Sequence, residues 1–427
     1  MKFSLLHPRD QLVTTMERIY HYGMTTTSGG NLSILDENGD MWITPAGVDK
    51  GTLRPADIIC VHPDGNIVGP HKPSSEYPFH RAIYTQRPDF RAIVHAHPPA
   101  LVAFSLARQT PDTRILAQTH ALCGPVGYAP YRLPGSLELG AIIAETFAQG
   151  VASVLLENHG IVAGGASLLT AFQRFETLDF CARTLIAAAR THNQAQPLSD
   201  EQLALAQQEE TLPTFAPSAH TGRERELRQE IVAFTRRAYQ RQLMTSAAGN
   251  ASARVDARTF LITPHGQDRL HFEIEDLVLI QEGRGEQGKT PSRMARLHQA
   301  IYAAHPDIGA ILMAQPPGVM AFGVAGQPLD TRLIPESYIM LRDIPLLPYG
   351  VQFGAWQQVA TPLSPATPAL LIQNEALLTT GATLLQAFDR MEVAEFSAQA
   401  VLHTTSLGAL APIGDAEIAE LEAKFLS

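Results

Sequence analysis

The stretch Ile-Thr-Pro-Ala-Gly at residues 43–47 returns 219 residues later as Ile-Thr-Pro-His-Gly at 262–266. The same spacing relates Gly30-Asn31 to Gly249-Asn250, and further matches follow in the same order at spacings of 216 to 218 residues. Because the matches stay colinear, they indicate one ancestral unit that is present twice. A period this long lies far outside the range of solenoid repeats, so we expect two globular domains.

The spacing of the two copies also predicts where the domains begin and end. A polar stretch rich in Gln, Glu and Pro separates them, which predicts a first domain at 1–195, a linker at 196–222 and a second domain at 223–427. Hydrophobic patterns in the first copy predict short strands interleaved with helices, without a regular βαβ period. We therefore expect a mixed α/β fold in which each domain has a mixed or largely antiparallel sheet flanked by helices. The expected helices span 8–22, 77–85 and 168–190, and the expected strands span 41–44, 58–61, 92–94 and 151–156.

The overall composition narrows the possible partners. Hydrophobic residues make up 45% of the 427 residues and charged residues 17%, which is typical of a globular chain. The net charge of −10 provides no basic surface for nucleic acid or an acidic membrane, and we expect neither partner. No signal-like or membrane-spanning stretch is apparent, so we expect a cytoplasmic protein. The three cysteines form no Cys-x-x-Cys pair, which argues against a disulfide framework or a thiolate zinc site.

Two histidines stand at the end of an apolar strand in Val-His-Ala-His. His95 and His97 are two residues apart, so on a strand they share one face. His159 follows another apolar strand, and three protein ligands with one open position are what a catalytic zinc requires. Three imidazoles also accept iron, cobalt or manganese. The alternative interpretation is that these histidines are polar strand residues with no ligand role.

The second copy bears on that choice, because Met313, Gln315 and Glu375 stand at the three corresponding positions. All three histidines are replaced together against a background that is otherwise well kept. If the three were unrelated residues, their joint loss would be a coincidence. As ligands of one metal ion, they would be lost together. The comparison therefore favours the metal site.

A third signal is the segment Lys-Pro-Ser-Ser-Glu before a predicted helix. Backbone N–H groups at a helix start, with the hydroxyls of Ser74 and Ser75, form a pocket suited to phosphate. Glu76 then stands where it can act as general acid or base. The alternative is an ordinary helix cap with a solvated glutamate. In the second copy Ser75 and Glu76 become Arg293 and Met294, so the acid is lost where the predicted metal ligands are lost.

Two glycine-containing turns are further candidates for phosphate binding. They are Gly29-Gly30-Asn31 and Thr44–Gly47, both of which present backbone N–H groups. Both turns persist in the second copy. A purely structural need for a tight turn therefore explains them nearly as well.

Together these motifs resemble the class II aldolase/adducin family over nearly all of residues 10–195. The second half resembles the same domain with its chemistry removed. The motifs that carry the resemblance are Gly-Asn-Leu-Ser (30–33), Ile-Thr-Pro-x-Gly (43–47), Lys-Pro-Ser-Ser-Glu (72–76), His-x-His-Pro (95–98) and Asn-His-Gly (158–160).

The resemblance implies a metal-dependent lyase of carbohydrate metabolism. A divalent ion, zinc in the first place, would be held by His95, His97 and His159, with Glu76 beside it as acid or base. Such an enzyme cleaves a ketose phosphate or similar hydroxy-ketone through a metal-stabilised enediolate. A glutamate at position 76 favours aldol cleavage over epimerisation. The residues that match phosphate-binding positions of the family are Gly30, Asn31, Thr44, Gly47, Ser74 and Ser75.

The resemblance leaves two alternatives and implies an assembly. A decarboxylase or epimerase of a phosphorylated sugar acid or pentulose remains possible within the family. A non-catalytic, adducin-like scaffold is the other alternative, but a scaffold has no need for an intact set of three histidines and a glutamate.

Family members form four-fold rings with sites between subunits. We therefore expect a homodimer that forms a pseudo-four-fold ring, in which the second half supplies a wall of each active site.

Overall fold

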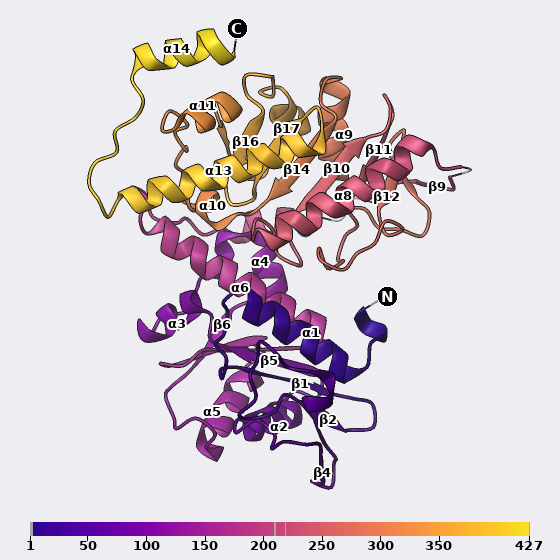
Figure 1. Cartoon of the computed structure of the whole chain (residues 1–427), viewed down its shortest axis with the longest axis vertical. Coiled ribbons are helices and arrows are strands. Elements are labelled where there is room, and N and C mark those ends of the chain that lie inside the picture. The colour runs from indigo at the N-terminus through magenta and orange to yellow at the C-terminus, as the bar shows by residue number, and fades with distance from the viewer. Residues whose placement is uncertain (1–2, 209–210, 218, 427) are drawn as a thin grey trace. The chain divides into compact units, whose positions relative to one another are not determined.

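The computed structural model describes residues 3–208, 211–217 and 219–426 (Figure 1). Residues 209, 210 and 218 of the predicted linker lie outside the described residues, as do positions 1, 2 and 427. The chain forms two compact units. The first contains the residues up to Thr113 together with Thr119–Arg183, and the second contains Arg114–Gln118 and the residues from Thr184 onward. This division falls within helix α6 (Leu168–Ala188), before the predicted boundary at 195.

The first unit is built on an eight-stranded sheet with the order β4-β3-β2-β1-β5-β8-β7-β6. Neighbouring strands are antiparallel except β6 and β7, which are parallel. The prediction of a mixed, largely antiparallel sheet is therefore confirmed. The strands are β1 (Asn31–Leu35), β2 (Met41–Ile43), β3 (Ile59–Val61), β4 (Ile67–Val68), β5 (Ala92–Ala96), β6 (Val126–Ala129), β7 (Ser153–Leu156) and β8 (Ile161–Gly165).

Helices cover both faces of this sheet. On one face, α1 (Pro8–His21) presents Leu12, Met16 and Ile19 at helical spacing, and these pack in one core with the phenylalanines of α6. On the other face, α2 (Tyr77–Gln86) packs against α5 (Leu137–Ala148) and closes a second core. The remaining helices of this part of the chain are α3 (Pro99–Leu106), α4 (Ala117–Cys123) and the short 3-10 turns η1 (Phe3–Leu5), η2 (Pro55–Asp57) and η3 (Thr113–Ile115).

The second unit repeats the plan with a nine-stranded sheet in the order β15-β16-β17-β14-β10-β11-β12-β13-β9. The β15/β16 and β13/β9 pairs are parallel and the other pairs are antiparallel. The strands are β9 (Thr214–Phe215), β10 (Asn250–Arg254), β11 (Thr259–Ile262), β12 (Val278–Gln281), β13 (Arg284–Glu286), β14 (Ala310–Ala314), β15 (Leu346–Leu347), β16 (Ala369–Ile372) and β17 (Ala376–Gly381).

In the second unit, helix α13 (Leu384–Thr404) lies along β14 and β17, as Figure 1 shows. The predicted linker contributes structure of its own: α7 (Asp200–Leu205) and strand β9, which extends this sheet. Among the described residues, no helix combines the length and apolarity needed to cross a membrane. The remaining helices are α8 (Gly222–Gln240), α9 (Ala295–Ala304), α10 (Pro317–Val324), α11 (Pro335–Leu341), α12 (Trp356–Ala360) and α14 (Asp415–Phe425).

Candidate metal centre

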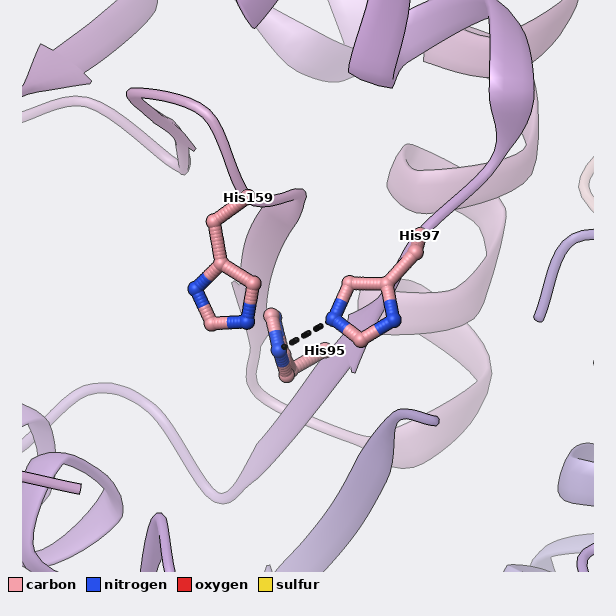
Figure 2. A group of neighbouring side chains, drawn as sticks. All are labelled: His95, His97 and His159. Atoms are coloured by element: carbon pink, nitrogen blue, oxygen red, sulfur yellow. Dashed lines mark hydrogen bonds between the residues drawn. The ribbon is translucent and has the colours of Figure 1, made fainter. Parts of the chain in front are cut away.

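Three histidines meet where strands β5, β7 and β8 of the first unit end or begin. His95 is the fourth residue of β5 and pairs with Asn31 of β1 on one side and Val162 of β8 on the other. His97 follows β5, and His159 lies in the turn between β7 and β8. Figure 2 shows the three rings turned toward one another. The antiparallel pairing of β5 with β8 is therefore what brings residues far apart in the sequence to one point.

The rings lie close enough for their nitrogens to share one ion. The centroid of the His95 ring is 4.8 Å from that of His97 and 4.9 Å from that of His159, and the latter two are 4.9 Å apart. Nε2 of His95 lies 3.1 Å from Nε2 of His97 (Figure 2). One ligand nitrogen from each ring lies within 4.8 Å of the others.

The His97 ring occupies space that is free because residues 29 and 160 are glycines. A Cβ on Gly160 would lie 2.5 Å from the Ala96 carbonyl oxygen and 2.5 Å from Cδ2 of His97. A Cβ on Gly29 would lie 2.8 Å from Nδ1 of the same ring. These distances are shorter than the van der Waals contacts of a carbon atom, so the ring position depends on glycine at 29 and 160.

Glu76 stands beside the histidines and is buried, with 7% of its surface exposed. It is the N-cap residue of α2, but its side chain caps nothing and turns to the cluster instead. Its Oε2 accepts a hydrogen bond from Nδ2 of Asn31 at 2.7 Å and lies 3.1 Å from Nε2 of His95. Its Oε1 lies 3.5 Å from Nε2 of His159 and accepts no hydrogen bond. This is not the solvated cap of the alternative interpretation.

The electrostatics of the cluster favour a carboxylate at Glu76 beside neutral His97 and His159. Burial in the first place, and the neighbouring His95 in the second, lower the pKa of His97 to about 3 and that of His159 to about 4. Both rings are therefore neutral at pH 7 and offer lone pairs. Burial alone raises the pKa of Glu76, but attraction to His95 and His159 and hydrogen bonds from His95 and Asn31 outweigh it. The net effect holds the pKa of Glu76 well below its ordinary range.

This donor set fits a divalent transition metal ion. Neutral imidazole nitrogens are the ligands that such ions prefer, and three of them leave a coordination position open. Nδ1 of His95 donates to the Ile161 carbonyl at 2.9 Å, which directs Nε2 toward the other two rings. Among the described residues, the buried Oε1 of Glu76 has no hydrogen-bond partner.

A buried chain of hydrogen bonds behind Asn31 was not singled out from the sequence as functional. Nε2 of His80 donates to Oδ1 of Asn31 at 2.5 Å, Nδ1 accepts from Oγ of Ser33 at 2.7 Å, and that hydroxyl accepts from the Tyr84 hydroxyl at 2.7 Å. His80 therefore fixes which side of the Asn31 amide faces Glu76. The signal in the sequence is that His-x-Ala-Ile-Tyr at 80–84 returns at 298–302, which marks the repeat but no function.

The predicted phosphate-binding residues lie on two adjoining segments. The bridge between Pro45 and Pro73, and the hydrogen bond from the Ser74 N–H to the Thr44 carbonyl at 3.2 Å, hold these segments together. Ser75 is exposed, and so is Gly47, whose φ of +70° suits glycine.

The other predicted phosphate ligands already have partners in the protein. The Thr44 hydroxyl is buried and accepts from the Leu32 N–H at 3.1 Å. Oγ of Ser74 accepts from the Glu76 N–H at 3.3 Å. Asn31 is fully engaged by Glu76 and His80. Gly30 has a φ of +73°, and a Cβ there would meet the His95 carbonyl at 2.9 Å, so this glycine also serves the turn.

Comparison with known proteins identifies the family of both halves of the chain. Residues 10–186 and 229–402 both match the Class II Aldolase and Adducin N-terminal domain family. A 5-deoxy-D-ribulose 1-phosphate aldolase from Bacillus thuringiensis serovar kurstaki is 35% identical over 179 residues, covering 41% of this chain and 82% of that protein. A 3-oxo-tetronate 4-phosphate decarboxylase from Haemophilus influenzae is 33% identical over 182 residues, covering 42% of this chain and 86% of that protein. A solved L-fuculose 1-phosphate aldolase is 33% identical, with a TM-score of 0.42, and the match covers 46% of this chain and 93% of that one.

The family match spans both halves, which confirms the resemblance and the duplication inferred from the sequence. The first matched stretch contains all eight strands of its sheet, and the second contains every strand of its sheet except β9. The chain therefore belongs to the class II aldolase and adducin N-terminal domain family and contains that domain twice.

Proposed function

We propose that this protein is a class II, metal-dependent lyase that cleaves a carbon–carbon bond of a ketose phosphate, with its catalytic centre in the first unit. The observation that carries the proposal is the buried carboxylate of Glu76 beside three convergent imidazoles. Relatives named as aldolases of phosphorylated deoxy-sugars support the reaction class. Class II aldolases depend on a divalent ion, and zinc is the ion that we propose here.

The residues that would hold the ion are His95, His97 and His159. When bound, a divalent ion supplies Lewis-acid stabilisation of the negative charge that develops next to the carbonyl as the carbon–carbon bond breaks. Nδ1 of His95 is held by the Ile161 carbonyl, so that ring cannot turn away from the site. Glycine at 29 and 160 keeps the His97 ring in place.

Glu76 would move the proton. Its Oε2 is held by Asn31, whereas its Oε1 accepts no hydrogen bond and can reach a substrate atom. A carboxylate in this position can take a proton from a substrate hydroxyl or carbon and return it after bond cleavage. Its burial excludes bulk water, which strengthens each charge interaction in the site.

The phosphate would be bound by two adjoining segments. One is the turn at 44–47, which follows β2, and the other is the segment at 74–75, which lies before α2. Ser75 and the Gly47 turn are exposed and can meet an anion directly. Asn31, Thr44 and Ser74 hold the turns and the carboxylate through hydrogen bonds, and Gly30 provides the positive φ of its turn. We propose that these four residues act mainly by positioning.

We further propose the domain arrangement 1–195, 196–222 and 223–427, with a second domain that has no metal ligands. In this proposal two chains form a pseudo-four-fold ring in which the second domain supplies a wall of each site. A chain that ends at residue 222 should then be inactive and poorly soluble. A soluble, fully active fragment of that length would contradict the arrangement, and light scattering of the full chain would test the dimer.

Decarboxylation is the second candidate, because the Haemophilus influenzae relative is a decarboxylase of a phosphorylated oxo-acid. Both reactions leave negative charge next to a carbonyl, so the same ion and the same glutamate serve either. A panel that contains 5-deoxy-D-ribulose 1-phosphate, L-fuculose 1-phosphate and 3-oxo-tetronate 4-phosphate separates them. Release of dihydroxyacetone phosphate indicates aldol cleavage, whereas release of carbon dioxide indicates decarboxylation.

The deciding experiment combines that panel with metal removal. Protein treated with a chelator should lose activity on every substrate and regain it when zinc or another divalent ion is added. The variant His97→Gln, which carries the residue found at the matching position of the second copy, should stay inactive after the same addition. Activity that survives chelation and this variant would overturn the metal-dependent mechanism, whereas the absence of both metal uptake and activity on every substrate would favour the adducin-like scaffold.

A further inference from the structure

A second group of metal-binding side chains lies on the β2–β3 hairpin, which β1 separates from β5 in the sheet. Met41 of β2 pairs with Val61 of β3, so Asp40 and His62 form the next cross-strand pair outward. Cys60 is two residues before His62 on the same strand and shares its face. One ligand atom from each of the three residues lies within 4.8 Å of the others.

The exposed fraction of the three side chains increases from Cys60 to Asp40 to His62. Cys60 is buried, with 3% of its surface exposed. Oδ1 of Asp40 lies 2.7 Å from Nδ1 of His62, and these side chains are 20% and 37% exposed. An ion could therefore enter from solvent, contact the buried sulfur and keep a water molecule on its outer side.

The surroundings of the sulfur suit a cation and do not suit a nucleophile. Burial raises the pKa of the Cys60 thiol, and the nearby carboxylates of Asp40 and Asp36 raise it further, whereas Arg9 opposes them. A raised pKa disfavours the thiolate that a nucleophilic cysteine needs. The same carboxylates attract a positive ion.

The turn at 36–40, which joins β1 to β2, holds Asp40 in place before any ion binds. Oδ1 of Asp36 accepts hydrogen bonds from the N–H groups of Asn38 at 2.9 Å and Asp40 at 3.0 Å. Oδ2 of Asp36 accepts from Nε1 of Trp42 at 3.1 Å, which ties the turn to β2. A rigid backbone lowers the entropy cost of gathering ligands around an ion.

The second copy keeps this hairpin and lacks all three ligands. There the matching cross-strand pair is Thr259 and Gln281, and Leu279 takes the place of the cysteine. The hairpin therefore folds without this group, and a need for stability does not account for it. As with the three histidines, the ligands are present in one copy and jointly absent from the other.

We propose that Asp40, Cys60 and His62 form a second metal site, distinct from the three histidines, for zinc or another transition metal ion of similar softness. One thiolate, one imidazole and one carboxylate with a water are typical ligands of zinc and unlike the all-oxygen shells of calcium or magnesium. As the metal–sulfur bond forms, the thiol proton passes to solvent. Cysteine spacing argued against a thiolate zinc site because only the folded hairpin brings these three ligands together.

Cobalt(II) added to the full chain after metal removal tests the site without any substrate. Only a thiolate gives a near-ultraviolet sulfur-to-cobalt charge-transfer band, and the three-histidine site has no sulfur ligand. The wild type should show this band and bind two equivalents of cobalt. Cys60→Ser should lose the band and one equivalent, whereas Cys123→Ser, which removes a buried thiol outside any such cluster, should lose neither.

Two further variants avoid the buried position. Asp40→Asn and His62→Gln change partly exposed residues and should each weaken the cobalt binding that produces the band by at least about tenfold. Cobalt saturation without the band in the wild type, or a band that survives in Cys60→Ser, would overturn the site. His97→Gln separates the two proposals, because it should abolish the other equivalent and leave the band unchanged.

Discussion

The two copies share a sheet, a buried hydrogen-bond network and their main turns, but differ around one point. In the first unit Ser33, His80 and Tyr84 are joined by hydrogen bonds, and in the second Ser252, His298 and Tyr302 are joined in the same way. The networks end differently. His80 continues through Asn31 to Glu76, whereas Nε2 of His298 and Oδ1 of Asn250 have no hydrogen-bond partner within the described part of the chain.

The differences around the metal centre go beyond the ligands. The positions of Gly29 and Gly160 are occupied by Ala248 and Ala376 in the second copy. In the first copy a Cβ at either glycine would collide with the His97 ring. Three histidines, one acid and two glycines are therefore replaced together. The second domain has lost both the ligands and the space that they need, while keeping the parts that stabilise the fold.

The largest expected effect is on catalysis. Glu76→Gln keeps the shape and the hydrogen bond with Asn31 but removes the proton acceptor, so kcat should fall about 10²–10⁴-fold. Glu375→Gln removes a buried acid of the second copy, at the position that matches His159, and should change kcat less than about twofold, because Glu375 belongs to neither group of candidate metal ligands among the described residues. Steady-state kinetics on the best substrate of the panel measures both. Equal losses in the two variants would mean that the second copy also takes part in the chemistry.

The glycine difference predicts the next largest effect. Gly160→Ala imitates the second copy and should displace the His97 ring, weakening metal affinity by about tenfold or more and stability by about 1–3 kcal/mol. The reverse change, Ala376→Gly, should cost about 0.5–1 kcal/mol of stability and leave metal binding unchanged. Competition with a chromophoric chelator, together with urea unfolding, measures both quantities. Wild-type metal affinity in Gly160→Ala would contradict the steric argument.

The shared histidines separate positioning from folding. His80→Asn and His298→Asn each remove part of a fully buried ring and leave a cavity, so both should lower the unfolding temperature to a similar degree. Only His80→Asn should also lower kcat, by about tenfold with little change in KM, because the Asn31 amide is released. His80→Gln carries an N–H that can reach Oδ1 of Asn31 and should restore part of the rate. A kcat equal to that of the wild type in His80→Asn would reduce His80 to a structural role.

The last prediction concerns stability in acid and not catalysis, and it rests on what the copies have in common. Burial lowers the pKa of both His80 and His298 from the ordinary 6.5 to about 3, so each ring is neutral in the fold. The unfolded chain takes up protons that the folded chain does not. The stabilisation from each neutral ring is thus complete above about pH 6.5 and is lost as the pH falls toward 3, at about 1.4 kcal/mol per pH unit for each histidine.

Urea unfolding across this range measures that loss. The variant His298→Asn should show a shallower pH dependence in the transition of the second unit and leave that of the first unit unchanged. A dependence as steep as that of the wild type would mean that other groups cause the loss of stability in acid.

Much of the site could be predicted from the sequence because the chain carries its own comparison. The repeat revealed two domains, and the joint replacement of His95, His97 and His159 indicated one site. Spacing along a strand places His95 and His97 on one face without any tertiary information. The helices and strands expected around them formed to within a few residues, for example α2 at Tyr77–Gln86. Alternating and helical patterns depend on local geometry, which the sequence carries directly.

Other features depended on contacts between distant segments. Asn31, which the sequence predicts as a phosphate ligand, also holds Glu76 and His80 through hydrogen bonds that no local pattern predicts. The hairpin group of Asp40, Cys60 and His62 arises from the register of β2 with β3, which no spacing rule supplies.

Sequence alone determined that the chain holds two related domains and that only one of them has the three histidines and the glutamate. Local patterns and an internal repeat are properties of residues close in the chain or compared in register, so they need no fold. Only the tertiary structure decided which polar groups satisfy one another, which glycines clear space for a ring, and which residues meet across paired strands. Those outcomes depend on distances of a few ångströms between segments that strand pairing brings together from far apart in the sequence.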